Sequence, residues 1–162
     1  MRAALIFCIL LAFLPTATAE EKAGQATPAS LEKAALLVDG ATRIDGSKTC
    51  TFEAKATGCL LTVKTSCVRQ IGSSKLEYWY TADIPVGSLD PSRTVAKAGA
   101  GDHPDTWGVD FATIGVKFPV TTDSGNKSEH SNGTIGFAQG KNAAKRAKYL
   151  ASLLLIANGK CR

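Results

Sequence analysis

The segment Lys141 to Arg162 reads KNAAKRAKYLASLLLIANGKCR and is the longest part of the chain with a clear helical periodicity. Its apolar residues recur at positions i, i+4, i+7, i+11 and i+14, which places them on one side of a helix. These residues are Ala143, Ala147, Leu150, Leu154 and Ala157. Because a single helix cannot bury such a stripe by itself, the rest of the chain must supply the surface that covers it.

The end of this helix is predicted at Asn158 and Gly159, a pair typical of the left-handed residue that follows a helix. The residues just before it are apolar on most sides of the helix, so we expect the last turns to be buried more deeply than the first ones. Cys161 follows at once and is placed to tie this end of the helix to another element.

The chain begins with a pattern typical of a secretory signal peptide over Met1 to Ala19. Arg2 precedes an apolar run from Leu5 to Leu14, which is too short to span a bilayer, and no later segment reaches the ~18 apolar residues that a transmembrane helix needs. We therefore expect a periplasmic or secreted protein with no transmembrane segment in its mature chain. The Ala-rich composition of the segment favours a bacterial source.

Cleavage after Ala19 would leave residues 20 to 162, which is 143 of the 162 residues and fits one domain. Residues 20–26 are small and polar and are interpreted as a flexible leader, so the predicted domain is 27–162. Its first element is a short helix with Thr27 as its cap, Pro28 at its first position and Gly40 at its end. The apolar face of this helix consists of Leu31, Ala34, Ala35 and Val38.

Alternation of apolar and polar residues begins near Thr49 and predicts strands. We expect a turn at Thr57-Gly58 and polar loops at 99–105 and 123–133, with a hairpin turn at Asn132-Gly133. The strands are predicted at 50–56, 59–67, 75–84, 93–98, 107–113, 116–122 and 134–138. This order predicts an α+β fold, an antiparallel sheet or partly open barrel of about six or seven strands with a short N-terminal and a long amphipathic C-terminal helix.

A Tyr-rich strand at 75–84, the segment DIPVGSLDP at 83–91, further strands and a C-terminal helix that ends near a cysteine follow one another in this chain. This arrangement resembles uncharacterised small bacterial secreted proteins with a pleckstrin-homology-like fold, over residues 49 to 161. The resemblance implies a fold and no activity.

Four cysteines remain after the predicted cleavage, and in an exported chain they predict two disulfides. Pairing Cys59 with Cys67 would fold one strand back on itself, since eight extended residues span roughly 26 Å and bridged Cα atoms lie within about 7 Å. Pairing Cys50 with Cys59 needs a turn where no turn residues occur. Of the three pairings we therefore favour Cys50 with Cys67 and Cys59 with Cys161, which would clamp the C-terminal helix to the sheet.

The loop GAGDHPDTW at 99–107 holds Asp102, His103 and Asp105, which are residue types that bind metals or transfer protons. The same residue types make solvated turns, which is the interpretation that we favour. The sequence contains no Walker, dinucleotide-binding or Gly-x-Ser-x-Gly pattern, so we expect no cofactor.

Two further features indicate binding. Trp79 lies on the polar face of its strand and is either a recognition residue or covered by another element such as the N-terminal helix. The last segment carries six basic residues and no acidic one: Lys141, Lys145, Arg146, Lys148, Lys160 and Arg162. Cations in the first turns of a helix oppose its dipole, so an anionic partner would explain the placement of Lys141, Lys145, Arg146 and Lys148.

These patterns predict a small, disulfide-stabilised, non-enzymatic binding protein. We expect its partner to be an anionic envelope surface or an acidic protein and not a nucleic acid. The alternative is a metal-binding protein or hydrolytic enzyme that uses Asp102, His103 and Asp105.

Overall fold

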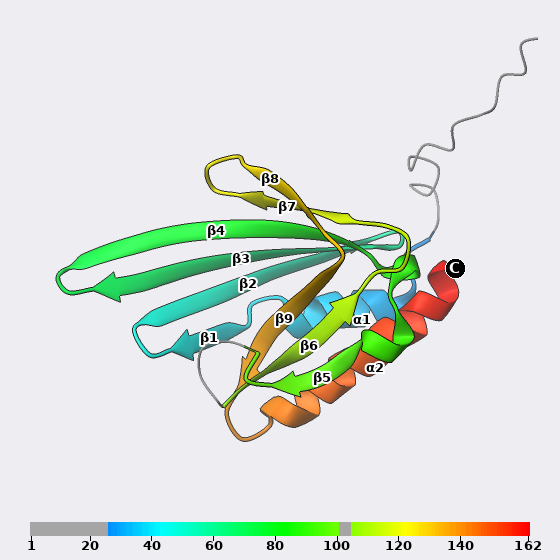
Figure 1. Ribbon diagram of the computed structural model, residues 1–162. Coiled ribbons are helices and arrows are strands. Elements are labelled where there is room, and N and C mark those ends of the chain that lie inside the picture. The colour runs from blue at the N-terminus through cyan, green and yellow to red at the C-terminus, as the bar shows by residue number, and fades with distance from the viewer. Residues whose placement is uncertain (1–25, 101–104) are drawn as a thin grey trace, which may run out of the picture.

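The computed structural model describes residues 26–100 and 105–162, and this part of the chain is α+β (Figure 1). It contains two α-helices, two single-turn 3-10 helices and nine strands. In chain order the elements are α1 (Ala29–Val38), β1 (Thr42–Asp45), β2 (Lys48–Thr57), β3 (Leu60–Ile71), β4 (Ser74–Pro85), η1 (Val86–Ser88), η2 (Pro91–Arg93), β5 (Val95–Ala98), β6 (Thr106–Ala112), β7 (Phe118–Thr122), β8 (Lys127–His130), β9 (Asn132–Gln139) and α2 (Ala143–Cys161).

The described strands form two antiparallel sheets and no closed barrel. Six strands pair in the order β1-β2-β3-β4-β7-β8, and three pair in the order β5-β6-β9. After β4 the chain leaves the larger sheet for β5 and β6, returns with β7 and β8, and leaves again with β9. The prediction of α+β is confirmed, whereas the expected single sheet of six or seven strands is corrected to nine strands in two sheets.

The meander β2-β3-β4 follows the alternation in the sequence. Gly58 and Gly72 adopt positive φ values of 55° and 58° in the two turns, where a side chain would be strained. One face of these strands, which we call the inner face, carries the buried side chains Cys50, Phe52, Leu61, Val63, Thr65, Cys67 and Ile84. The opposite, outer face is polar and in contact with solvent, which is the division that period-two patterning predicts.

The ends of β3 and β4 extend beyond the body of the protein, on the left in Figure 1. Residues 68–77 are all exposed, including Ile71 and Leu76. This hairpin therefore depends on its own backbone pairing, which continues to the pair Ile71 and Ser74.

Helix α1 buries the predicted apolar face of Leu31, Ala34, Ala35 and Val38, with Ser30 beside it. The predicted cap is wrong. Thr27 Oγ1 accepts a hydrogen bond from the backbone N–H of Gly58 at 2.8 Å, and Pro28 is the N-cap. At the other end the Asp39 carboxylate accepts from the N–H of Ala54 at 3.0 Å. Both ends of α1 are thus bonded to β2 or to the turn after it, which protects that strand edge.

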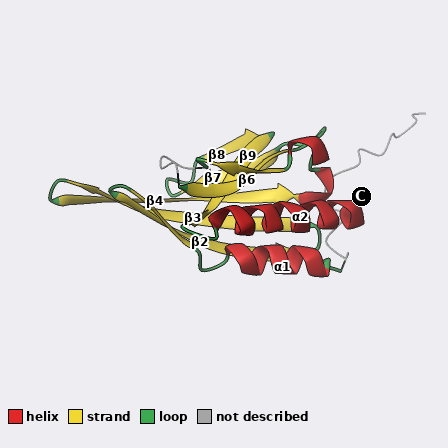
Figure 2. Ribbon diagram, turned by 90° about the horizontal axis from the view of Figure 1, so that it is seen from below, coloured by secondary structure: helices red, strands yellow, loops and turns green. Residues whose placement is uncertain are grey.

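Helix α2 lies beside α1 and contacts η1, β5, β6 and β9, as Figure 2 shows from below. All five residues of its predicted stripe are buried. The predicted stop is wrong, because the helix continues through Asn158 and Gly159 to Cys161. The Asn158 amide is buried and donates to the carbonyl oxygens of Val86 at 2.8 Å and Leu89 at 3.1 Å. This tertiary use of the amide replaces the local role that the sequence indicated.

The depth of α2 also differs from the expectation. Leu153 is buried near its end, but Ile156 is 53% exposed. The last turns therefore keep a solvent-facing side and are not surrounded by the core.

Both favoured disulfides are present. Cys50 and Cys67 are paired in register across β2 and β3, and their sulfurs are bonded. Cys59 and Cys161 form the second bond across 102 residues and join the β2-β3 turn to the end of α2. Gly87 in η1 lies against this end, since a Cβ on it would meet the carbonyl oxygen of Cys161.

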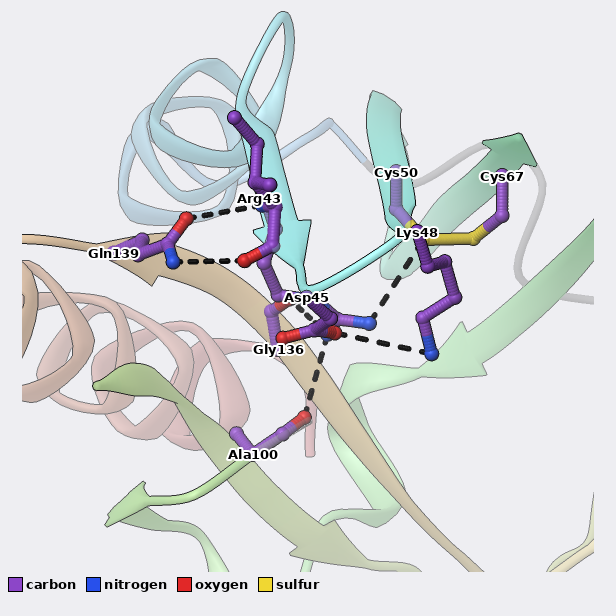
Figure 3. Close-up of polar contacts among 9 residues, drawn as sticks. Arg43, Asp45, Lys48, Cys50, Cys67, Ala100, Gly136 and Gln139 are labelled. Atoms are coloured by element: carbon purple, nitrogen blue, oxygen red, sulfur yellow. Dashed lines mark hydrogen bonds and ion pairs between the residues drawn. A yellow bond between two sulfur atoms is a disulfide. The ribbon is translucent and has the colours of Figure 1, made fainter. Parts of the chain in front are cut away.

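A buried polar cluster joins the two sheets where β1 meets β9 (Figure 3). Arg43 Nε lies 2.9 Å from the Asp45 carboxylate, and Arg43 Nη1 donates to the carbonyl oxygen of Gly136 at 2.6 Å. The Gln139 side chain both accepts from the N–H of Ile44, at 2.9 Å, and donates to its carbonyl oxygen, at 2.8 Å. The Gln139 amide thus forms the two hydrogen bonds with Ile44 that a backbone N–H and C=O would form in a paired strand.

Candidate functional site

The predicted metal or general-base loop can be placed only in part. Asp102 and His103 lie outside the described residues, so their roles stay predictions. Asp105 borders an open hollow of about 600 Å³ together with Trp107, Gln139 and Lys141. Within residues 26–100 and 105–162 no group of three or more His, Cys, Asp or Glu side chains is arranged to hold a metal ion.

Trp79 lies on the outer face of β4, where it is paired in register with Ser66. The side chain is 37% exposed, and the Lys64 ammonium lies 5.9 Å from the centre of its ring. Neither α1 nor any other described element covers it fully. The Lys64 ammonium is attracted to the electron-rich face of the indole ring. This contact gives Trp79 a favourable partner on the polar face of the strand.

The basic residues of the last segment divide into two groups. Lys141, Lys145 and Lys148 are exposed and form no ion pair with another described residue. Arg146 is half-buried, with Nη2 donating to the carbonyl oxygen of Leu37 at 3.2 Å and its guanidinium 5.2 Å from the centre of the Phe137 ring. Arg146 therefore links α2 to α1 and β9, whereas the three lysines remain open to solvent.

The exposed side of α2 combines these charges with apolar groups. Lys145, Lys148, Tyr149, Ser152 and Ile156 are all exposed and follow the spacing i, i+3, i+4, i+7 and i+11. That spacing places them on one face, which we call the basic face of α2. Tyr149 is 52% and Ile156 is 53% exposed. The two apolar side chains were not assigned a role from the sequence, because their periodicity is hidden among the buried leucines.

A cavity of about 240 Å³ lies between the inner face of the larger sheet and the smaller sheet. Its walls are mostly apolar, and His130 and Asn132 lie among the few polar residues that line it. His130 is held by a 2.9 Å hydrogen bond between its Nε2 and the Ser128 hydroxyl. No pattern in the sequence indicates this cavity, since its lining comes from seven strands whose sheet partners could not be predicted.

The carboxylate of Asp110 serves as a structural link. It accepts from the Thr134 hydroxyl at 2.6 Å and pairs with the Lys97 ammonium at 2.8 Å, which joins β5, β6 and β9. Burial alone would raise the pKa of Asp110, but the hydrogen bonds from Lys97 and Thr134 and the charge of Lys97 outweigh it and hold the pKa below its ordinary value of 3.8. The Asp110 carboxylate is thus ionised at neutral pH and already bonded to Lys97 and Thr134, so it is poorly suited to act as a general base.

Comparison of the chain with family models, with curated proteins and with solved structures gave no match. The resemblance to secreted proteins with a pleckstrin-homology-like fold therefore stays a prediction. Among the described helices, none has the length and apolar content needed to cross a bilayer. The two disulfides fit a protein of an oxidising compartment.

Proposed function

We propose that this protein is a non-enzymatic binding protein of an oxidising compartment outside the cytoplasm and that it attaches to anionic lipid through the basic face of α2. One observation carries the proposal. Lys145 and Lys148 form no ion pair with another described residue and accompany the exposed Tyr149 and Ile156 on α2, a helix that contains no acidic residue; the equally unpaired Lys141 lies in the turn just before it.

The chemistry of the face matches the boundary of an anionic bilayer. A helix that lies in the headgroup plane presents cations to the phosphates and apolar side chains to the acyl region. Each lysine near such a surface contributes about 1 kcal/mol, so the three together supply about 3 kcal/mol that salt can remove. Burial of Tyr149 and Ile156 adds an apolar contribution that salt does not remove.

The position of the lysines supports the same conclusion. Lys145 lies in the first turn of α2, where the positive end of the helix dipole disfavours a cation by about 0.3 to 1 kcal/mol. No acidic residue in that turn offsets this cost. An anionic partner at this end would offset it, because the partner would interact favourably with both the lysine and the dipole.

Sedimentation with lipid vesicles tests the proposal. The oxidised protein, residues 20–162, is mixed with vesicles of phosphatidylcholine alone or with one third phosphatidylglycerol, at low salt and at 0.5 M salt. We expect the protein to pellet with the anionic vesicles at low salt and to be released by high salt. Binding to both lipids alike, or to neither, would overturn the proposal; capture by an acidic protein instead would leave the vesicle result negative.

A matched pair of variants assigns the binding to α2. Changing Lys141, Lys145 and Lys148 to Gln removes two charges from the basic face of α2 and one from the turn just before it. Changing Lys55, Lys75 and Lys127 to Gln removes three charges from exposed strand positions elsewhere. Only the first set should lower binding, by about a hundredfold. Tyr149→Ser with Ile156→Ser should weaken binding and leave its salt dependence unchanged. Equal effects of the two lysine sets would show that net charge alone drives adsorption.

A further inference from the structure

The cavity between the two sheets has the walls of a ligand site. Phe52, Val63 and Ala82 reach it from the larger sheet, and Phe111 and Ile135 from the smaller sheet. The space of about 240 Å³ is partly open to solvent and is lined mostly by apolar side chains. Small-molecule sites are typically concave and apolar with a few polar groups in them.

Phe111 of the smaller sheet is in contact with other residues that line the cavity. The Phe111 ring packs against Phe118, with ring centres 5.4 Å apart, and lies across Gly133. A Cβ at Gly133 would come within 2.8 Å of the tip of that ring. The absence of a side chain at Gly133 therefore lets the tip of the Phe111 ring approach the backbone of β9.

One polar group inside the cavity has no partner. Thr65 lines the cavity and is only 2% exposed, and its hydroxyl forms no hydrogen bond with any other residue that the structure describes. The Thr65 oxygen is not one of the fully enclosed side-chain atoms that lack a partner, so it is accessible from the cavity. The register pairs Thr65 with Phe52 on one side and Tyr80 on the other, so the free hydroxyl lies at the centre of the inner face.

The rim carries polar groups. Tyr80 and Asn132 line the cavity, and their side chains form no hydrogen bond with other described residues. His130 adds an imidazole next to the Phe118 ring, with ring centres 6.1 Å apart. No aspartate, glutamate, lysine or arginine of the described chain lines the cavity. A charged ligand would thus find no carboxylate, ammonium or guanidinium partner in the lining, which disfavours it relative to an uncharged one.

We infer that this cavity binds a small uncharged molecule of the size of one substituted aromatic ring, with a hydroxyl group that bonds to Thr65. A cavity of about 150 Å³ is enough for benzene, and the larger space here leaves room for a substituent. The ring would lie among the phenylalanine and aliphatic walls. This site is separate from the basic face of α2, and neither proposal depends on the other.

The test compares phenol with toluene, which have nearly the same shape and differ in the hydroxyl. Each is titrated into the oxidised protein, labelled with nitrogen-15, while amide chemical shifts are recorded. We expect saturable shifts at residues that line the cavity, Val63, Val120 and Ile135 among them, and tighter binding of phenol. Shifts that do not saturate, or that spread over the surface, would overturn the inference.

Two variants assign the binding to the cavity. Ala82→Leu fills the space, and Ala98→Leu makes the same change at an exposed position of β5. Only Ala82→Leu should abolish the shifts. Thr65→Val keeps the shape of the side chain and removes the hydroxyl, so phenol binding should weaken about fivefold to tenfold while toluene binding is unchanged.

Thr65→Val keeps the test decisive if Ala82→Leu fails to fold correctly. If Ala82→Leu disturbs the sheet, its amide spectrum as a whole changes, and Thr65→Val, a nearly isosteric change, then decides. Equal weakening of phenol and toluene in Thr65→Val, or no weakening of either, would contradict the role assigned to the hydroxyl.

Discussion

Arg43 of β1 donates from Nη1 to the carbonyl oxygen of Gly136 in β9 at 2.6 Å, so one buried side chain bonds the larger sheet to the smaller one. The same guanidinium lies 2.9 Å from the Asp45 carboxylate, and both side chains are almost fully buried. The positive charge of Arg43 is thus compensated by the Asp45 carboxylate of the same strand, β1.

Removing the cation alone should be costly. Arg43→Met leaves Asp45 buried without its nearest partner, and breaking such a pair costs about 3 to 5 kcal/mol. The double variant Arg43→Met with Asp45→Leu removes both charges and should recover a large part of the loss. Urea unfolding of the oxidised variants measures both values. A double variant that is less stable than Arg43→Met would show that the ion pair itself, and not the unpaired carboxylate, dominates.

Gly136 should not tolerate a side chain. A Cβ there would lie 2.6 Å from Arg43 Nη1 and closer still to the carbonyl oxygen of Ala100, so Gly136→Ala should destabilise the fold by about 1 to 3 kcal/mol. Gly159→Ala is the matched control. It lies in α2 with nothing within 4 Å of the added carbon and should stabilise the helix by up to about 1 kcal/mol. Thermal unfolding of the two variants should therefore shift in opposite directions.

The two disulfides should differ in their contributions. The Cys59–Cys161 bond closes a separation of 102 residues and the Cys50–Cys67 bond one of 17 residues. Chain entropy then predicts losses of about 4.7 and about 3 kcal/mol when each pair is changed to alanine. Denaturant unfolding of the two double-alanine variants gives the comparison. A larger loss for Cys50 and Cys67 would mean that contacts within the sheet outweigh loop closure.

Asp110 should make the fold sensitive to acid. Its pKa in the folded protein lies below the ordinary value of 3.8, so its carboxylate stabilises the fold above that value, and the stabilisation is lost as the pH falls through the lowered pKa. Asp110→Asn should be less stable than the wild type at pH 7, and the difference should shrink below pH 3.8. Unfolding curves between pH 2 and pH 7 measure it. A difference that is independent of pH would assign the effect to packing of the side chain.

Much of the fold was predictable where the pattern is local. The meander β2-β3-β4 and the buried stripe of α2 follow from periodicity. The turn predicted at Thr57-Gly58 lies one residue later, at Gly58 and Cys59. Strand β8 was predicted as loop, because all four of its residues are exposed and show no alternation. Asn132-Gly133 was predicted as a hairpin turn, but both residues belong to β9 and pair with β6. Which sheet a strand joins depends on partners far away in sequence, which periodicity does not report.

The candidate sites show the same limit. The exposure of Lys141, Lys145 and Lys148 agrees with the helical pattern, whereas the contact of Arg146 with Leu37 depends on how two helices pack. The cavity depends on the separation of the two sheets, which the sequence does not indicate. For the same reason, the sequence alone does not distinguish Thr65 from the other threonines of the chain.

The β2-β3 hairpin also bears on which cysteines meet first when the chain is exported with its N-terminus leading. Cys50, Cys59 and Cys67 become available for oxidation well before Cys161. The register places Cys50 opposite Cys67 and leaves Cys59 at the turn, eight residues along an extended strand and so roughly 26 Å from Cys67. We therefore expect the first disulfide to join Cys50 to Cys67, and we expect Cys59 to stay a thiol until the C-terminal helix brings Cys161 to it.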